Sequence, residues 1–183
     1  MKLLFDTCVL YPTVMRDTLM GVCRIMDWTP LWSDRILEEW ARAARKIGPL
    51  GEDQARAEIA LLKAAWPKAC VSWPASLEAR LYLPDEADRH VLAAAIAGSA
   101  DRLVTMNIKD FPRNTLWEEG VERSGPDELI MEAWPHHSDA IKALAADMVA
   151  RASEMSGEAW TARALFKKAR LPRFAKAVSA ALG

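Results

Sequence analysis

Short apolar runs alternate with segments of helical periodicity through most of this 183-residue chain. An apolar run, a helical segment and a further apolar run form the pattern of units that join parallel strands. The alternation therefore predicts an α/β fold, with a central, mostly parallel sheet flanked by helices. We expect strands at residues 2–5, 30–32 and 102–105, with further candidates at 69–73 and 121–123. We expect helices at residues 13–26, from Ser33 to the break at Gly48-Pro49, at 53–65 and at 88–98.

The C-terminal part of the chain is predicted to be helical. Two alanine-rich helices are expected at residues 138–153 and 158–182, with breaks at Ser156-Gly157 and at Pro172. The segment Trp134-Pro135-His136-His137 is a plausible joint before them. We therefore expect a main domain over residues 1–133 and a C-terminal helical extension over residues 134–183, too small for a large core of its own, that packs on the main domain.

The composition is that of a globular protein and excludes several other classes. Apolar residues make up 51 % and charged residues 27 % of the chain, and 8 Gly with 10 Pro are too few for a disordered or fibrous protein. No uncharged apolar run approaches the length of about 18 residues that spans a membrane. An acid as early as Asp6 argues against a secretory signal, and three cysteines without CxxC spacing fit a reducing cytoplasm and argue against zinc.

Charge is divided unevenly along the chain. Residues 1–133 carry 16 basic and 21 acidic side chains, whereas residues 134–183 carry 8 and 4. This polarity falls short of the basic excess of a dedicated nucleic-acid-binding protein, so it neither establishes nor excludes a nucleic-acid substrate. A basic group in the extension is a candidate for binding RNA phosphates or a partner, and a solvated helix face explains it equally well. The group consists of Arg163, Lys167, Lys168, Arg170 and Arg173.

Acidic residues lie near the ends of the expected strands or at helix starts. Asp6 closes the first strand, Glu39 lies early in the helix after Ser33, Asp88 begins the helix at 88–98, and Asp110 follows the strand at 102–105. Sites in open parallel sheets form outside the carboxyl ends of the strands, where such acids can converge. Gathered carboxylates repel one another unless a cation neutralises them, and oxygen ligands suit Mg²⁺ or Mn²⁺. The helix dipole alone also favours acids at helix starts.

Four ordered motifs resemble those of the PIN domain family, over about residues 1–133. They read Phe5-Asp6-Thr7-Cys8-Val9-Leu10, Ser33-x-x-Ile36-Leu37-Glu38-Glu39, Leu83-Pro84-Asp85-x-x-Asp88-Arg89-His90-Val91-Leu92 and Leu103-Val104-Thr105-x-Asn107-x-x-Asp110-Phe111-Pro112. Pro126-Asp127-Glu128-Leu129-Ile130 is similar to the segment that closes one PIN subfamily. The resemblance implies a three-layer PIN-like fold and a metal-dependent ribonuclease of the kind found in VapC-type toxins. Such an enzyme hydrolyses RNA phosphodiesters with a metal-activated water.

The resemblance also implies roles for individual residues. Asp6, Asp88 and Asp110 would be metal ligands, and Glu39 would be the fourth catalytic acid, with Glu38 its solvent-facing neighbour. Supporting roles would fall to Thr7, Thr105, Asn107 and Asp85, of which Asp85 is an extra acid that ranks below Asp88. The implied cofactor is Mg²⁺ or Mn²⁺. The implied partners are an RNA substrate, a cognate antitoxin and a second copy of the chain.

Other interpretations of the same residues remain open. Asp110 could be a turn acid before Phe111-Pro112, and His90 in its apolar helix is expected to be a packed or surface histidine rather than a ligand. A phosphohydrolase of the haloacid-dehalogenase type needs a second acid two residues after the first, where this chain has Cys8. A non-catalytic module that keeps a PIN fold for RNA or protein contacts is the alternative from a different class.

Overall fold

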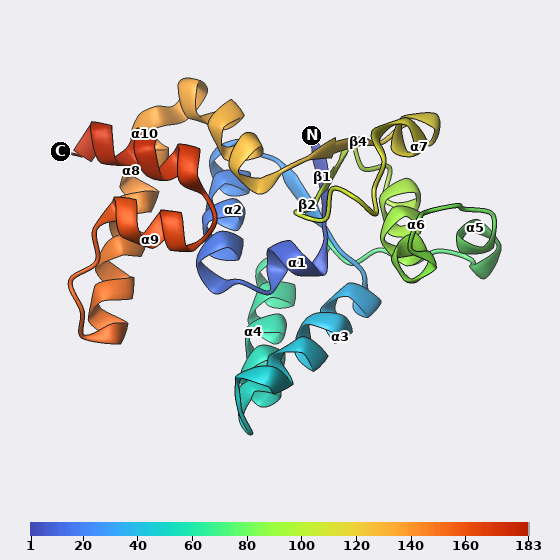
Figure 1. Ribbon diagram of the computed structural model, residues 1–183, viewed down its shortest axis with the longest axis horizontal. Helices are drawn as coiled ribbons and strands as arrows, with labels where there is room; N and C mark the ends of the chain where they lie inside the picture. Colours follow the sequence, from blue (N-terminus) through green and yellow to red (C-terminus); the bar gives the residue numbers. More distant parts are fainter. Residues whose placement is uncertain (183) are drawn as a thin grey trace. The chain divides into compact units, whose positions relative to one another are not determined.

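The computed structural model describes residues 1–182, whose internal contacts divide the chain into two units (Figure 1). The first unit consists of residues 1–11 and 29–124. The second consists of residues 12–28 together with the chain from residue 125 onward. The chain therefore leaves the first unit after its first strand, contributes one helix to the second unit and then returns.

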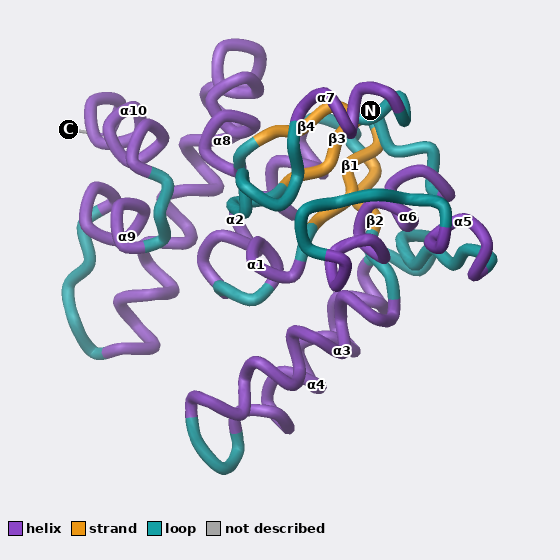
Figure 2. The backbone as a smooth tube through the Cα atoms, turned by 45° about the vertical axis from the view of Figure 1, so that its right-hand side comes forward, coloured by secondary structure: helices purple, strands orange, loops and turns teal. Residues whose placement is uncertain are grey.

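A parallel sheet forms the centre of the first unit, as predicted. Its strands are β1 (Lys2–Phe5), β2 (Thr29–Leu31), β3 (Arg102–Val104) and β4 (Glu122–Ser124). They lie in the order β2-β1-β3-β4, and every pairing is parallel (Figure 2). Within the sheet, Phe5 is paired with Val104, and Leu4 with both Leu31 and Leu103. The last three residues of β1 are fully buried, as is usual for a central strand of a parallel sheet.

The candidate strand at residues 69–73 is not formed. Within residues 1–182, this segment makes one isolated bridge, between Trp32 and Cys70. The bridge is held by hydrogen bonds from Trp32 N to Ala69 O and from Val71 N to Trp32 O. The chain then reaches Pro74, which has no backbone N–H to donate and which precedes a short helix, so the pairing stops after one bridge.

Helices flank the sheet in the first unit. They are α1 (Thr7–Leu10), α3 (Asp34–Ala43), α4 (Gly51–Ala65), α5 (Ala75–Ala79), α6 (Arg89–Ala97) and α7 (Arg113–Glu118), with 3₁₀ turns at Ala44–Ile47 and Glu86–Asp88. α6 packs against β1 and β3, and α3 packs against α1 and α4. Ser33 is the N-cap of α3, because its Oγ accepts a hydrogen bond from Ile36 N at 3.2 Å.

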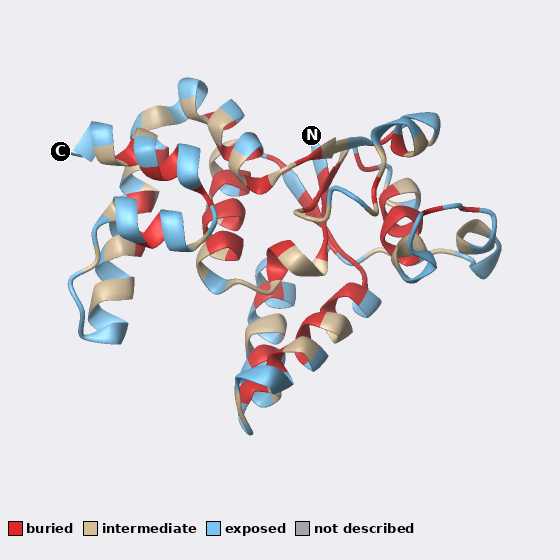
Figure 3. Cartoon of the chain, in the orientation of Figure 1, coloured by how far each residue is buried: buried red, intermediate tan, exposed pale blue. Residues whose placement is uncertain are grey.

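The second unit is helical. It contains α2 (Thr13–Ile25), α8 (Pro126–Ser156), α9 (Ala162–Lys168) and α10 (Pro172–Leu182). α8 packs against α2 and α10, and α9 packs against α10 (Figure 3). The ring of Phe174 makes edge contacts with the rings of Phe166 and Trp134, at centroid distances of 4.8 and 5.9 Å. The breaks predicted at Ser156-Gly157 and Pro172 are confirmed by the end of α8 and the start of α10.

The predicted joint at residues 134–137 coincides with a kink in α8. α8 spans 31 residues, but Pro135 lies inside it and His137 has non-helical angles (φ −141°, ψ 42°), so two helical segments meet there. A proline removes one helical hydrogen bond and kinks or breaks the helix. The predicted boundary between residues 133 and 134 therefore falls inside α8, and Gly183, the last residue of the predicted extension, lies outside the described residues. Across residues 1–182, no helix combines the length and apolar character needed to cross a membrane.

Asp127 links the start of α8 to the start of α10. It lies in the first turn of α8, and its carboxylate accepts hydrogen bonds from the backbone N–H groups of Arg173 and Phe174 at 2.9 and 3.0 Å. These groups belong to the first turn of α10, where no earlier residue of the helix can pair with them. Asp127 therefore caps a helix that begins more than 40 residues later in the chain.

We expect Asp127→Ala to lower the free energy of unfolding by about 1 kcal/mol, the usual effect of losing a helix cap. The measurement is urea unfolding followed by circular dichroism. Glu154→Ala is the matched control, because Glu154 is an exposed acid of the same helix. Equal stability of the two variants would show that the cap does not contribute.

Candidate metal centre

The site begins where β1 and β3 end side by side. The strand order changes direction at β1, and ligands of open parallel sheets bind at such a point, outside the carboxyl ends of the strands. Asp6 directly follows β1 and Thr105 directly follows β3. Both side chains are buried, and Thr105 Oγ1 donates a hydrogen bond to Asp6 Oδ2 at 2.7 Å. Asp6 thus closes the first strand, as predicted, and Thr105 holds its carboxylate.

A second set of hydrogen bonds connects β3 with the start of α6. Asn107 N donates to Thr105 Oγ1 at 2.9 Å, and Asn107 Nδ2 donates to Asp88 Oδ2 at 3.3 Å. Asp88 directly precedes α6, which packs on the sheet. The loop after β3 therefore holds both Asp6 and Asp88, and the predicted supporting residues Thr105 and Asn107 are the ones that touch them.

Three carboxylates gather at this edge of the sheet. Asp85, Asp88 and Asp110 each offer one oxygen, and these oxygens lie within 4.8 Å of one another. Asp85 is exposed and the other two are half-buried. The pKa of Asp88 is raised to about 6, first by burial and then by the negative charges of Asp6, Asp85 and Asp110. Hard oxygen donors at this spacing, with mutual repulsion to be neutralised, fit a divalent cation such as Mg²⁺ or Mn²⁺.

The three residues of this cluster are not the same three that were predicted as metal ligands. Asp85, which the sequence ranked as a supporting acid, lies in the cluster, and its Oδ1 also accepts a hydrogen bond from Ala87 N at 2.9 Å. Asp6 lies outside this group of three among the described residues, although its charge raises the pKa of Asp88. The ligand roles of Asp6, Asp88 and Asp110 stay predictions.

Glu39 is held from two sides. Its Oε2 accepts a hydrogen bond from Thr7 Oγ1 at 3.0 Å, and its Oε1 lies 2.9 Å from His90 Nε2 and 3.7 Å from Arg35 Nε. Burial alone raises the pKa of Glu39, but the contacts with His90, Thr7 and Arg35 outweigh burial and hold it below its ordinary value. Glu38 instead forms surface ion pairs with Arg42 and Arg56.

Two residues near the site were not expected to contact it. His90 is buried, as predicted for a packed histidine, but it also reaches Glu39. Cys8 Sγ donates to Asp6 Oδ2 at 3.0 Å and accepts from Met106 N at 3.3 Å. The pKa of this thiol is raised to about 12, mainly by burial and then by the charge of Asp6, so Cys8 is protonated at neutral pH. The contact of His90 with Glu39 joins two separate helices, so no local sequence signal reveals it, whereas Cys8 and Asp6 are only two positions apart in sequence.

The predicted basic group lies on the surface of the second unit. Arg163, Lys167 and Lys168 belong to α9, Arg170 follows it and Arg173 belongs to α10. All five side chains are exposed, while the apolar residues between them form the core of the unit. Lys168 Nζ lies 4.9 Å from the centre of the Trp160 ring, a cation–π contact.

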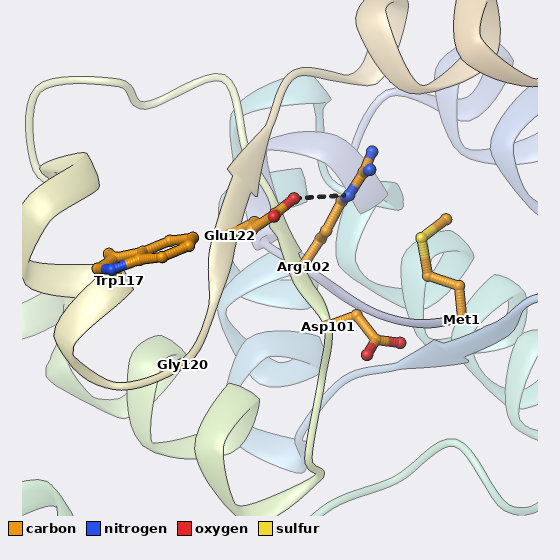
Figure 4. Close-up of a pocket in the computed structure, with 6 residues that line it drawn as sticks. All are labelled: Met1, Asp101, Arg102, Trp117, Gly120 and Glu122. Atoms are coloured by element: carbon orange, nitrogen blue, oxygen red, sulfur yellow. Dashed lines mark ion pairs between the residues drawn. The ribbon is translucent and has the colours of Figure 1, made fainter.

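A separate pocket lies at the opposite, amino-terminal ends of the strands (Figure 4). Met1 precedes β1, Asp101 precedes β3, and Arg102 forms an ion pair with Glu122 at the starts of β3 and β4. Trp117 and Gly120 complete the lining. None of the predicted site residues lines this pocket, so it is distinct from the acidic cluster.

Comparison with known proteins decides the family. The sequence matches the PIN domain family over residues 2–109, which is more than half of the chain. The chain belongs to the PIN domain family. The matched segment contains Asp6, Glu39 and Asp88 and ends one residue before Asp110.

This PIN domain protein is also similar to a curated relative. A Mycobacterium tuberculosis protein (strain ATCC 25618 / H37Rv) named "Putative ribonuclease VapC50" is 37 % identical over 62 residues, which are 34 % of this chain. The match spans 37 % of the length of that relative. No solved structure matched the chain significantly.

The raised pKa of Asp88 makes stability depend on pH. Between pH 3.8 and about 6, Asp88 keeps its proton in the folded chain, whereas in the unfolded chain it has already released it. The free energy of unfolding of the metal-free protein should therefore fall as pH rises through this interval. We expect Asp85→Asn to reduce this fall, because it removes one of the charges that raise the pKa of Asp88. Urea unfolding at several pH values measures the effect.

The control for this experiment is Asp53→Asn, an exposed acid on α4. Mn²⁺ should raise the unfolding midpoint more at pH 7 than at pH 5, because the cation needs ionised carboxylates. A pH slope that is the same in Asp85→Asn and Asp53→Asn would contradict the electrostatic coupling between Asp85 and Asp88.

Proposed function

We propose that this PIN domain protein is a metal-dependent endoribonuclease, and that it is the toxin of a type II toxin–antitoxin pair. The observation that carries the proposal is the gathering of Asp85, Asp88 and Asp110 beside Asp6, with the pKa of Asp88 raised by its neighbours. The family membership and the name of the relative support the nuclease chemistry. A cytoplasmic location is part of the proposal.

The residues at this edge of the sheet have different roles in the proposed reaction. Asp6, Asp88 and Asp110 would hold Mg²⁺ or Mn²⁺, with Asp85 within reach. The cation, when bound, would neutralise the carboxylates and activate the water that attacks phosphorus. Thr105 and Asn107 orient the carboxylates of Asp6 and Asp88 through hydrogen bonds, and Glu39 is the fourth acid.

We expect Asp6→Asn to reduce RNA cleavage by more than about 100-fold, since it removes a ligand charge whereas loss of an outer partner alone costs about 10- to 100-fold. The assay uses mixed tRNA and rRNA fragments with Mg²⁺, with Mn²⁺ and with EDTA. Asp53→Asn, which alters an exposed acid on α4, is the control and should cleave like the wild type.

The outcomes of this assay separate the candidate functions. Discrete products that need the metal and disappear in Asp6→Asn support the nuclease. Full metal-dependent cleavage by Asp6→Asn would overturn the assignment of the site. RNA binding without cleavage under any condition would favour a non-catalytic PIN module, provided that a mass measurement finds no co-purified antitoxin.

We further propose that the basic group on α9 and α10 contacts RNA phosphates. The acidic cluster repels a polyanion, so binding energy has to come from cationic side chains elsewhere, and all five residues of the group are exposed. An antitoxin would instead approach the carboxylates with a basic side chain, by charge complementarity. Self-association into a homodimer is part of the proposal, and light scattering tests it.

We expect the double variant Lys167→Gln with Arg170→Gln to bind RNA more weakly at low salt. Loss of two phosphate contacts on a single strand should reduce the slope of log affinity against log salt by about 1.4. The measurement is fluorescence anisotropy with labelled RNA. All variants also carry Asp6→Asn, which prevents cleavage of the RNA. The control, Lys46→Gln with Lys68→Gln, removes the same charge from exposed positions of the first unit. Equal slopes in the two double variants would contradict the proposal.

A further inference from the structure

His90 is a buried polar residue with one polar contact in the part of the chain that the structure describes. Its side chain is 1 % exposed, within α6, and its Nε2 lies 2.9 Å from Glu39 Oε1. Its Nδ1 is buried and has no hydrogen-bond partner among residues 1–182. Leaving a buried polar atom unpaired costs free energy, so an apolar residue would fill this space at lower cost. The contact with Glu39 is the compensating interaction that the structure shows.

The contact joins two elements that carry site residues. His90 is two positions after Asp88, on the helix that packs against β1 and β3. Glu39 is on α3, and its other oxygen accepts a hydrogen bond from Thr7, the residue after Asp6. Thus Thr7 and His90, which hold Glu39, lie one position after Asp6 and two positions after Asp88.

Arg35 is a weak substitute for His90. Its Nε is 3.7 Å from Glu39 Oε1, beyond ordinary hydrogen-bond length, and about half of its side chain is exposed. Arg35 also forms a shorter ion pair, at 3.0 Å, with Glu78. The orientation of Oε1 therefore depends on the buried imidazole rather than on the half-exposed guanidinium, which pairs with Glu78.

We propose that His90 is a positioning residue, whose Nε2–H fixes the carboxylate of Glu39 relative to Asp6 and Asp88. The inference rests on the proposed nuclease function, because the position of Glu39 matters there for catalysis. In this proposal His90 acts through Glu39. Its role requires the proton on Nε2, which leaves Nδ1 as the unpaired atom of the ring.

The test compares two amides of different reach. His90→Gln places an amide N–H near the position of Nε2, whereas the shorter side chain of His90→Asn ends near the position of Nδ1 and cannot reach Glu39. We expect His90→Gln to retain kcat within about threefold and His90→Asn to lower kcat by about 10-fold or more, with KM unchanged in both. The substrate is a fluorescence-quenched RNA oligonucleotide taken from a fragment that the wild type cleaves. His136→Asn, the same change at an exposed position of α8, is the control.

A double-mutant cycle tests the hydrogen bond without any activity. Urea unfolding of His90→Asn, Glu39→Ala and the double variant should give non-additive losses, because either change alone removes the same contact. Additive losses, or equal kcat values for His90→Gln and His90→Asn, would overturn the inference. A wild type that cleaves no RNA with any metal would instead refute the proposed function, and this inference with it.

Discussion

The parallel pairing of β1 with β3 is the contact on which the site depends. Because the two strands run in the same direction, their carboxyl ends lie together, and the residue after each strand faces the other. This is why Asp6 and Thr105 meet, although almost 100 residues separate them in sequence. Two further sets of contacts extend from this pair, one through Asn107 to Asp88 and one through Thr7 to Glu39.

The price of this convergence is electrostatic repulsion. Asp88 is flanked by the charges of Asp6, Asp85 and Asp110 in partly buried surroundings, and its pKa rises accordingly. Neutral donors, the hydroxyl of Thr105 and the amide of Asn107, hold the carboxylates in place without neutralising them. Glu39 has the opposite environment, since its contacts lower its pKa. The site thus lowers the pKa of Glu39 and raises that of Asp88, and a bound cation would relieve the repulsion around Asp88.

Local patterns predicted the sheet and the acids, because both depend on neighbouring residues. Residues 2–5 and 102–105 are mostly apolar, which favours burial in a strand whatever the partner strand is. Ser33 caps the helix that it precedes through its own side chain. Contacts between elements could not be predicted in this way. The failed strand at 69–73 depends on how far its pairing with Trp32 continues.

The same distinction applies to the site. Asp6 and Asp88 could be selected because they lie at the end of a strand and the start of a helix, and Asp110 because it follows a strand. The place of Asp85 in the cluster and the contact of His90 with Glu39 depend on the relative positions of whole elements. A single sequence carries no direct record of such distances.

The discontinuity of the second unit has a consequence for protein synthesis. α2 emerges from the ribosome about a hundred residues before α8, the helix that packs against it. At a translation rate of about 5–20 residues per second, α8 is synthesised roughly 5–20 s after α2. Its buried face, which includes Leu19 and Val22, is accessible to chaperones during that time. All residues of the first unit are synthesised before α8, so the first unit can close while the second still lacks α8, α9 and α10.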